Sequence, residues 1–470
     1  MMMRAGAILA AGNILSALLN FLRNILIARL ISVEDYGIAA TFIITASVIG
    51  MLSNLSLDRL IVQAPDGDDP KLISAVQGFT LARGFMNSAL LFALAWPMAA
   101  LFGHPDLVWA YQFVALPPLL NAFNHLDMAR YQRRMNFTPT AVNNAAASLI
   151  SLLAVWPMAL WLGDFRVMLF QIVLNAALMV AGSHLMAERP FRIGWDMTVI
   201  RRAFAFGWPL LISGGLTFLI MQGDRIVVGN QFGAYELGLF SAAVTFAIAP
   251  STILDGILRQ FFMPLLSRLQ DRREAFEMAA VAVMQALLCA GVGLAALFAL
   301  FAAPVFSMVY GERYVPAVPA MLMLAALFSL RLMRAGPTTV SISRAATRSP
   351  MYANIVRLIS FPLAFLAAAQ GASVTMVVAI SALGELASMA LAVFLVQSRL
   401  GILRLDLMGW PYLLSLAALL ILASLSEFPP VGLFDWRHAV MVALGITLLV
   451  LCREMRGRVF DEIRRARKRG

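Results

Sequence analysis

Charged side chains are scarce in this chain of 470 residues. Asp, Glu, Lys and Arg make up 13% of it, whereas hydrophobic residues make up 61%. Soluble domains carry roughly 25% charged residues, so a water-soluble fold would have too few charges to cover its apolar side chains. The composition also excludes an intrinsically disordered chain and a coiled coil. It indicates a lipid bilayer, which solvates apolar side chains directly.

Cysteine, histidine and lysine are also rare. The two cysteines, Cys289 and Cys452, lie in or beside apolar stretches, which excludes a disulfide framework. The four histidines lack the spacing of a metal site, so we expect neither a metal nor another cofactor. The only lysines are Lys71 and Lys468. The net charge of +11 is therefore carried almost entirely by arginines.

Long apolar runs recur along the whole chain. A run of about 20 apolar residues can cross the roughly 30 Å hydrocarbon core of a bilayer as a helix. Turn signals such as Glu34-Asp35-Tyr36-Gly37 separate the runs. The sequence predicts an all-α integral membrane protein with about fourteen transmembrane helices, at 8–30, 38–57, 76–102, 107–126, 141–161, 167–187, 205–227, 238–260, 279–302, 317–343, 352–369, 373–397, 408–425 and 438–453.

The positions of the basic residues predict the topology, because Lys and Arg gather in the cytoplasmic loops of membrane proteins. With fourteen helices and a cytoplasmic carboxyl terminus, 26 of the 36 basic residues fall on the cytoplasmic side and three on the opposite side. We therefore expect a multi-pass plasma-membrane protein with both termini in the cytoplasm. Its basic tail, at 454–470, is expected to attract anionic lipids. We do not expect nucleic-acid binding, because topology alone accounts for these charges.

Ten charged residues inside the predicted helices are assigned to neither side, whereas Arg357 and Arg453, which also fall within predicted runs, are counted on the cytoplasmic side. An ionised group at mid-membrane costs about 2.5–3.5 kcal/mol on insertion scales, so such groups usually face a partner or a wet cavity and mark a transport path. Arginines outnumber acidic residues among them, which indicates a cavity suited to an anion. The arginines are Arg23, Arg29, Arg83, Arg225, Arg259, Arg331 and Arg334, and the acidic residues are Asp224, Asp255 and Glu385.

Several of these residues also have a purely structural interpretation. Asp255 and Arg259 are four residues apart and can form an ion pair on one helix. Arg331 and Arg334 share a helix face, which fits a pocket as well as a pair that extends to the membrane interface. Two arginines near helix ends can also extend to the interface, namely Arg29 and Arg83.

A weak internal repeat has an offset of 201 residues. The segment Arg23–Ala28 aligns with Asp224–Gly229, and Asp35-Tyr36-Gly37 aligns with Glu236-Leu237-Gly238. The offset takes the first predicted helix to the seventh, so we expect two parallel six-helix repeats with a substrate site at their interface. The predicted domains are an amino-terminal lobe at 1–203, a carboxyl-terminal lobe at 204–400, two additional helices at 401–453 and the tail at 454–470.

Two segments resemble a known family. The segment 12–37, with Arg23-Asn24-Ile25-Leu26-Ile27-Ala28-Arg29-Leu30 at its centre, resembles the start of the polysaccharide transporter (Wzx-type oligosaccharide flippase) family. The segments 206–210 and 223–238 are similar to the start of that family's second half. Lipid II flippases and multidrug antiporters of the same superfamily share looser forms of these motifs. By position, charged residues of the family match Arg23, Arg29, Asp224 and Arg225.

The resemblance implies two pseudo-symmetric helical lobes, a cationic central cavity and alternating access. It implies a flippase of the bacterial inner membrane, not an enzyme, whose substrate is an oligosaccharide attached through a diphosphate to a polyprenol. Such a substrate would be an O-antigen, exopolysaccharide or capsule repeat unit. Planar guanidinium groups suit the diphosphate. Amide side chains are candidates for sugar contacts, namely Asn24, Gln222 and Asn230, together with Asn13, Asn20, Asn121 and Asn124.

Energy coupling and two rival functions stay open. Proton or sodium coupling would need a titratable carboxylate, for which Asp224, Asp255 and Glu385 are the candidates. A cation or drug antiporter would need acidic residues in its cavity, and the first six predicted helices have none in their middles. A glycan polymerase or glycosyltransferase usually needs a larger extramembrane domain than connections of about 20 residues provide. Polysaccharide-assembly proteins are the expected partners of a flippase.

Overall fold

A computed structural model describes residues 2–52, 57–346, 348–401, 405–427 and 436–452, together with 455 and 457. These residues form helices and no strand, which confirms the predicted all-α class. Contacts between residues divide the chain into two compact units, unit 1 at Met1–Gly238 and unit 2 at Leu239–Gly470. The basic tail predicted to meet anionic lipids lies almost wholly outside the described residues.

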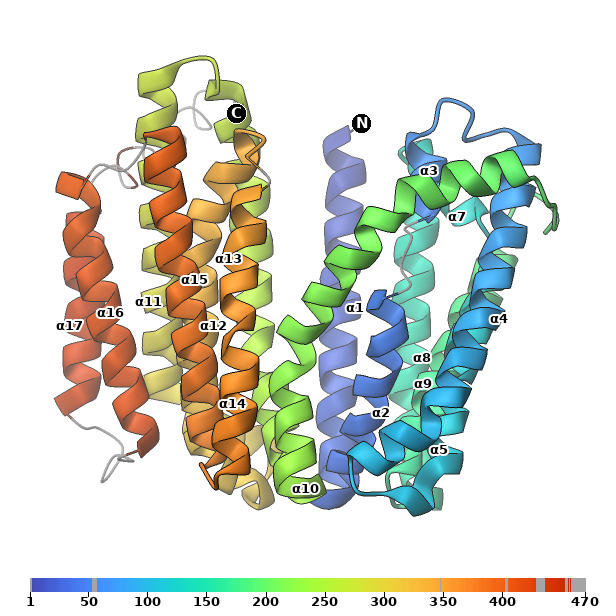
Figure 1. Ribbon diagram of the computed structural model, residues 1–470, viewed down its shortest axis with the longest axis horizontal. Helices are drawn as coiled ribbons and strands as arrows, with labels where there is room; N and C mark the ends of the chain where they lie inside the picture. Colours follow the sequence, from blue (N-terminus) through green and yellow to red (C-terminus); the bar gives the residue numbers. More distant parts are fainter. Residues whose placement is uncertain are drawn as a thin grey trace. The chain divides into compact units, whose positions relative to one another are not determined.

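Unit 1 is built around long apolar helices that pack lengthwise (Figure 1). Its elements are α1 (Met2–Leu30), α2 (Val33–Leu52), α3 (Leu57–Gln63), α4 (Pro70–Leu101), η1 (Pro105–Leu107), α5 (Val108–Phe113), α6 (Leu116–Asn121), α7 (Asp127–Arg133), α8 (Thr138–Leu162), α9 (Arg166–Leu185) and the first part of α10 (Met197–Leu269). Helix α8 contacts both α1 and α9, and α4 contacts α2, α5 and α6.

Unit 2 is organised around α12, which contacts α11, α15 and α16 (Figure 1). Nearly every side chain of α12 is buried, because helices surround it on several sides. The elements of unit 2 are the rest of α10, α11 (Arg273–Tyr310), η2 (Glu312–Ala317), α12 (Val318–Ser343), α13 (Arg348–Leu358), α14 (Ser360–Ala369), α15 (Val374–Leu400), α16 (Leu405–Glu427) and α17 (Trp436–Leu451).

The predicted count of fourteen spans is not confirmed. Among the described residues, eleven helices are long and apolar enough to cross a membrane, and α17 is a shorter apolar helix. One reason is α10, whose 73 residues contain the predicted runs 205–227 and 238–260 as two helical segments that meet at a kink at Gly233 and are counted as one span. Another is the run 107–126, which forms the short helices α5 and α6. Pro117 and Pro118 begin α6, and a proline lacks the N–H that would continue the preceding helix.

The two acid-x-Gly segments are helical rather than turns. The chain reverses before α2, where the Ser32 Oγ accepts a hydrogen bond from the Asp35 N–H at 3.0 Å and so caps the helix. In α10 the non-helical residue is Gly233, with φ 84° and ψ −176°. This conformation favours glycine because a Cβ would be strained at such a φ.

The glycine of each segment lies very close to the backbone of the other segment. A Cβ on Gly37 would lie 1.8 Å from the backbone oxygen of Ala234, and a Cβ on Gly238 would lie 2.0 Å from that of Val33. The offset of 201 residues separates Gly37 from Gly238, and it also separates Val33 from Ala234. The contact is therefore reciprocal, because each glycine lies against the backbone four residues before the other.

We expect Gly37→Ala to lower the unfolding temperature of the purified protein. The added methyl group would overlap a backbone oxygen, and overpacking of this kind costs about 1–3 kcal/mol. Gly50→Ala on α2 is the matched control, since no atom lies within 4 Å of a Cβ at that position. Alanine there is favoured in a helix by about 1 kcal/mol. Equal unfolding temperatures for the two variants would contradict the close contact.

Loops at one end of unit 1 are joined by ion pairs. The Arg130 Nε donates to Asp68 Oδ1 at 2.9 Å, and Arg202 forms hydrogen bonds of 2.7 and 3.0 Å to Asp66. The hydrogen bond from Arg202 holds the pKa of Asp66 below its usual value, and that from Arg130 does the same for Asp68. The acidic segment 66–69 thus ties together loops that the sequence assigns to the cytoplasmic side.

These ion pairs make unit 1 sensitive to acid. Because the folded-state pKa values of Asp66 and Asp68 lie below the unfolded value of about 4, the pairs stabilise the fold above pH 4. That contribution is lost as the pH falls through the lowered pKa values. We expect Asp68→Asn to lower the unfolding temperature at pH 6, and its difference from the unmodified protein to shrink toward pH 3. A difference that stays constant with pH would argue against the ion pairs.

Candidate functional site

Two of the predicted arginines, Arg23 on α1 and Arg83 on α4, line one cavity of about 480 Å³ in unit 1. We call it the Arg23 cavity. Helices α1, α2, α4, α6 and α9 surround it. Among the described residues that line it, none is acidic. Its polar lining consists of the two arginines, Thr80, Asn87, Asn121 and Asn175.

Local sequence explains how the helices leave this space. Gly84 allows α4 to approach the end of α6, where a Cβ would lie 2.2 Å from the Cβ of Ala122. The short helix α6 begins at the proline pair and brings Asn121 to the cavity. Asn87 follows Arg83 by four residues and therefore lies on the same face of α4. Arg23 lies seven residues before the end of α1, which is about two helical turns along the helix.

The charged side chains among the described lining residues of this cavity are arginines. The Nε and Nη1 atoms of Arg23 are buried and have no hydrogen-bond partner among the described residues. Arg83 interacts electrostatically with Asp58, a residue of α3 outside the cavity lining. A buried guanidinium with unused donors is costly, and such groups in membrane proteins usually serve function. An oxyanion in the cavity would supply the acceptors that the protein does not provide.

Unit 2 contains a second group of intramembrane charges, which we call the Glu385 cluster. It consists of Glu385 on α15, Arg331 and Arg334 on α12, and Arg357 on α13. The fully buried Glu385 carboxylate accepts a hydrogen bond from Arg334, and its Oε2 lies 2.9 Å from Arg357 Nε and 3.7 Å from Arg331 Nε. The Arg334 Nη1 also donates to Asn354 Oδ1 at 3.3 Å.

The Glu385 cluster carries two more positive charges than negative ones. Its arginine side chains are 18% exposed or less, so most of this charge is shielded from solvent. A single carboxylate that faces three guanidinium groups acts as their counter-ion, which is a structural role. Arg331 also lies over the Phe328 ring, with 4.8 Å between the guanidinium carbon and the ring centroid. The cluster therefore holds excess positive charge inside unit 2.

Comparison with known proteins places the chain in a family. Residues 26–319 match the family model described as polysaccharide biosynthesis protein. The chain belongs to this family. The resemblance seen in the segments 12–37 and 206–238 is thus confirmed.

One curated relative of this chain is named as a transport protein. The chain is 23% identical over 258 residues to the succinoglycan biosynthesis transport protein ExoT of Rhizobium meliloti. The alignment covers 54% of this chain and 52% of ExoT, so the chain spans about half the length of that relative. The printed name of this relative is that of a transport protein and not of an enzyme.

Two solved structures share the fold of this chain. The lipid II flippase MurJ in an inward closed conformation matches with a TM-score of 0.67 at 13% identity, over 96% of this chain and 99% of that one. An inward-facing multidrug resistance MATE family transporter of the MOP superfamily matches with a TM-score of 0.63 at 12% identity, over 87% and 96% of the chains. The chain therefore has the fold of these two structures, and its described residues contain eleven helices long and apolar enough to cross a membrane.

Asn121, a predicted sugar-contact amide, also lines the Arg23 cavity, whereas the other predicted residues do not line it in the described part of the chain. On α1, Arg29 is exposed and Asn24 is half-buried. Arg259 pairs with Asp255 at 3.0 Å, as the structural interpretation predicts, and both side chains are partly exposed. Asp224 and Arg225 are partly buried on α10.

Two of the predicted sugar-contact amides take part in helix packing. The Gln222 side chain accepts a hydrogen bond from Arg225 at 3.2 Å and donates one to the Ser47 Oγ at 3.2 Å. The Asn230 amide donates to the backbone oxygen of Leu101 at 2.6 Å. These bonds join α10 to α2 and to the end of α4, which gives both amides a structural role.

Four polar or charged residues of these two sites were not recognised from the sequence. The Arg23 cavity is lined by three of them, Thr80, Asn87 and Asn175, and the spacing of Asn87 from Arg83 was the available signal. Arg357 was counted as a loop residue, although it lies inside the predicted run 352–369. Its burial beside Glu385 shows that it belongs with the intramembrane charges.

Proposed function

We propose that this chain is a flippase that moves an oligosaccharide, linked through a diphosphate to a polyprenol, across the bacterial plasma membrane by alternating access. The substrate class is that of an O-antigen, exopolysaccharide or capsule repeat unit. In this proposal the diphosphate binds at Arg23 and Arg83. The observation that carries it is one cavity with two arginines, unused Arg23 donors and no acidic lining residue.

The chemistry of the cavity lining fits the polar part of this substrate. Guanidinium groups form charge-assisted and often bidentate hydrogen bonds with phosphate oxygens. Amides such as Asn87, Asn121 and Asn175 can donate to and accept from sugar hydroxyls. The isoprenoid tail can stay in lipid, so the protein needs to shelter only the diphosphate and the sugars.

The same lining disfavours the main rival. A cation or drug antiporter of this fold would need a carboxylate to attract its substrate, and the cavity offers arginines instead.

Proton or sodium coupling through Asp224, Asp255 or Glu385 stays a prediction, as do the central cavity between lobes, the cytoplasmic termini and the contact with polysaccharide-assembly proteins. Reconstitution with labelled polyprenyl-diphosphate oligosaccharide tests the proposal, because a flippase changes the sidedness of the glycan and an enzyme changes its structure.

A further inference from the structure

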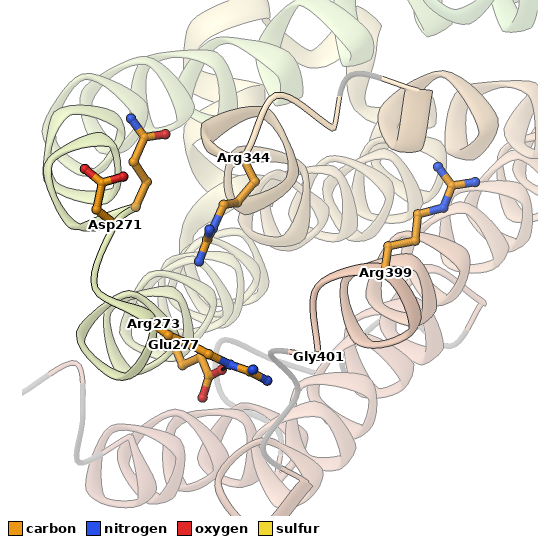
Figure 2. A pocket seen from close by; sticks show the side chains of 7 residues that line it. Asp271, Arg273, Glu277, Arg344, Arg399 and Gly401 are labelled. Carbon is orange, nitrogen blue, oxygen red and sulfur yellow. Dashed lines mark hydrogen bonds and ion pairs between the residues drawn. The ribbon is translucent and has the colours of Figure 1, made fainter.

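A pocket of about 520 Å³ lies at one end of unit 2, outside both arginine groups described above (Figure 2). We call it the Arg344 pocket. The turn between α10 and α11, the end of α12 and the end of α15 form its walls. Its charged lining residues are Asp271, Arg273, Glu277, Arg344 and Arg399. The sequence predicts that these chain segments lie on the cytoplasmic side. Their arginines were interpreted there only as determinants of topology.

Aromatic rings, rather than carboxylates, hold two of the three arginines. The Arg344 guanidinium carbon lies 4.1 Å from the centroid of the Phe276 ring, and that of Arg399 lies 5.5 Å from the centroid of Tyr352. In the described part of the chain, neither Arg344 nor Arg399 forms an ion pair. A guanidinium stacked on a ring is held in place through its face, while the N–H groups at its edge stay available.

The backbone and the third arginine complete the arrangement. Arg344 caps α12, and the next residue, Ala345, has a φ of 56°, which ends the helix sharply. In Figure 2 the Arg344 side chain extends from the end of α12 toward Arg273 and Glu277 at the start of α11. Arg273 donates to Glu277 at 2.9 Å, so one of the three arginines is neutralised locally. The pocket thus presents pre-oriented donors with uncompensated positive charge.

We propose that the Arg344 pocket binds a phosphate group at the guanidinium edge of Arg344. Its five charged lining side chains carry a net charge of +1, to which Arg399 contributes although its side chain points away from Arg344 in Figure 2. An anionic phospholipid headgroup and a soluble phosphate share this chemistry. Fixed guanidinium groups bind phosphate oxygens with little loss of side-chain freedom, which favours a specific site over a diffuse charged surface. This inference is independent of the flippase proposal, because the pocket contains none of the residues assigned to the transported substrate.

Ligand-dependent stabilisation of the purified full chain tests this site. One arm uses nanodiscs of phosphatidylcholine with increasing phosphatidylglycerol, and the other adds inorganic phosphate to phosphatidylcholine nanodiscs. A ligand that binds the folded state raises the unfolding temperature in a saturable way. We expect saturation in at least one arm, which identifies the source of the phosphate. Arg344→Gln should weaken the apparent Kd by about tenfold, since a hydrogen bond to a charged group contributes about 1.5–3 kcal/mol, and Arg399→Gln should weaken it less.

Two further variants make the result decisive. Arg268→Gln is the matched control, because Arg268 is an exposed arginine at the end of α10 that does not line the pocket. It should change the apparent Kd by less than about twofold. Arg344→Lys keeps the charge that topology requires but loses the planar donor edge, so it should also weaken binding. Absence of saturation in both arms, or equal weakening by Arg344→Gln and Arg268→Gln, would overturn the proposal.

Discussion

Arg23→Gln should lower the initial rate of glycan translocation at least about tenfold at low substrate concentration while leaving the protein as stable as before. Hydrogen bonds to charged groups contribute about 1.5–3 kcal/mol each, and 1.4 kcal/mol corresponds to a factor of ten in binding. Stability should not fall, because the buried Nε and Nη1 atoms of Arg23 have no hydrogen-bond partner to lose among the described residues. Translocation into vesicles and the unfolding temperature measure the two effects.

Variants of the same and of a distant arginine separate this prediction from a general loss of charge. Arg83→Gln should also slow translocation, since Arg83 lines the same cavity. Arg23→Lys should be intermediate, because lysine keeps the charge but not the bidentate geometry. Arg313→Gln, at an exposed position in η2, should have an activity within about twofold of the unmodified protein. A destabilised but fully active Arg23→Gln variant would show that Arg23 is structural.

Glu385→Gln should mainly lower the stability of unit 2, whereas Arg23→Gln should mainly lower the translocation rate. The substitution leaves three buried or nearly buried guanidinium groups without their shared counter-ion. Removal of one partner from a buried ion pair costs about 3–5 kcal/mol. For a unit of this size that corresponds to a fall in unfolding temperature on the order of 10 °C. Thermal unfolding of the purified variant, followed by a probe in unit 2, measures it.

A second substitution distinguishes the charge from simple packing. Arg357→Gln in the Glu385→Gln background removes one uncompensated charge, so the double variant should be more stable than Glu385→Gln alone. Glu277→Gln is the control, because Glu277 pairs with an arginine whose side chain is 81% exposed. Exposed pairs contribute about 1 kcal/mol or less. If Glu277→Gln and Glu385→Gln have the same effect, the proposed counter-ion role is wrong.

Most of the long helices could be predicted because a membrane-spanning helix needs an uninterrupted apolar run, and that property is local. The divisions within runs were harder to foresee. The pair Pro117-Pro118 divides one run into two short helices, and two other runs join at a kink at Gly233 within α10. Ser32, rather than the acid-x-Gly motif, marks the reversal before α2, because its hydroxyl caps the helix.

The candidate sites could be predicted only residue by residue. Arg23 and Arg83 stood out because charge is costly in a bilayer, but nothing in the sequence says that α1 and α4 bring them to one cavity. Glu385 appeared as a coupling candidate, whereas its partners lie on two other helices. Which side chains come together depends on how the helices pack, and the apolar runs do not determine that packing.

Sidedness of a labelled glycan in proteoliposomes tests the central claim most directly. The purified chain is reconstituted with a fluorescent polyprenyl-diphosphate oligosaccharide, and a membrane-impermeant reagent measures how much glycan is accessible outside over time. The account predicts that the glycan crosses the membrane chemically unchanged in vesicles with the unmodified protein, and at a rate near that of protein-free vesicles with Arg23→Gln. Unchanged sidedness with a correctly inserted protein, or a chemically altered glycan, would contradict it.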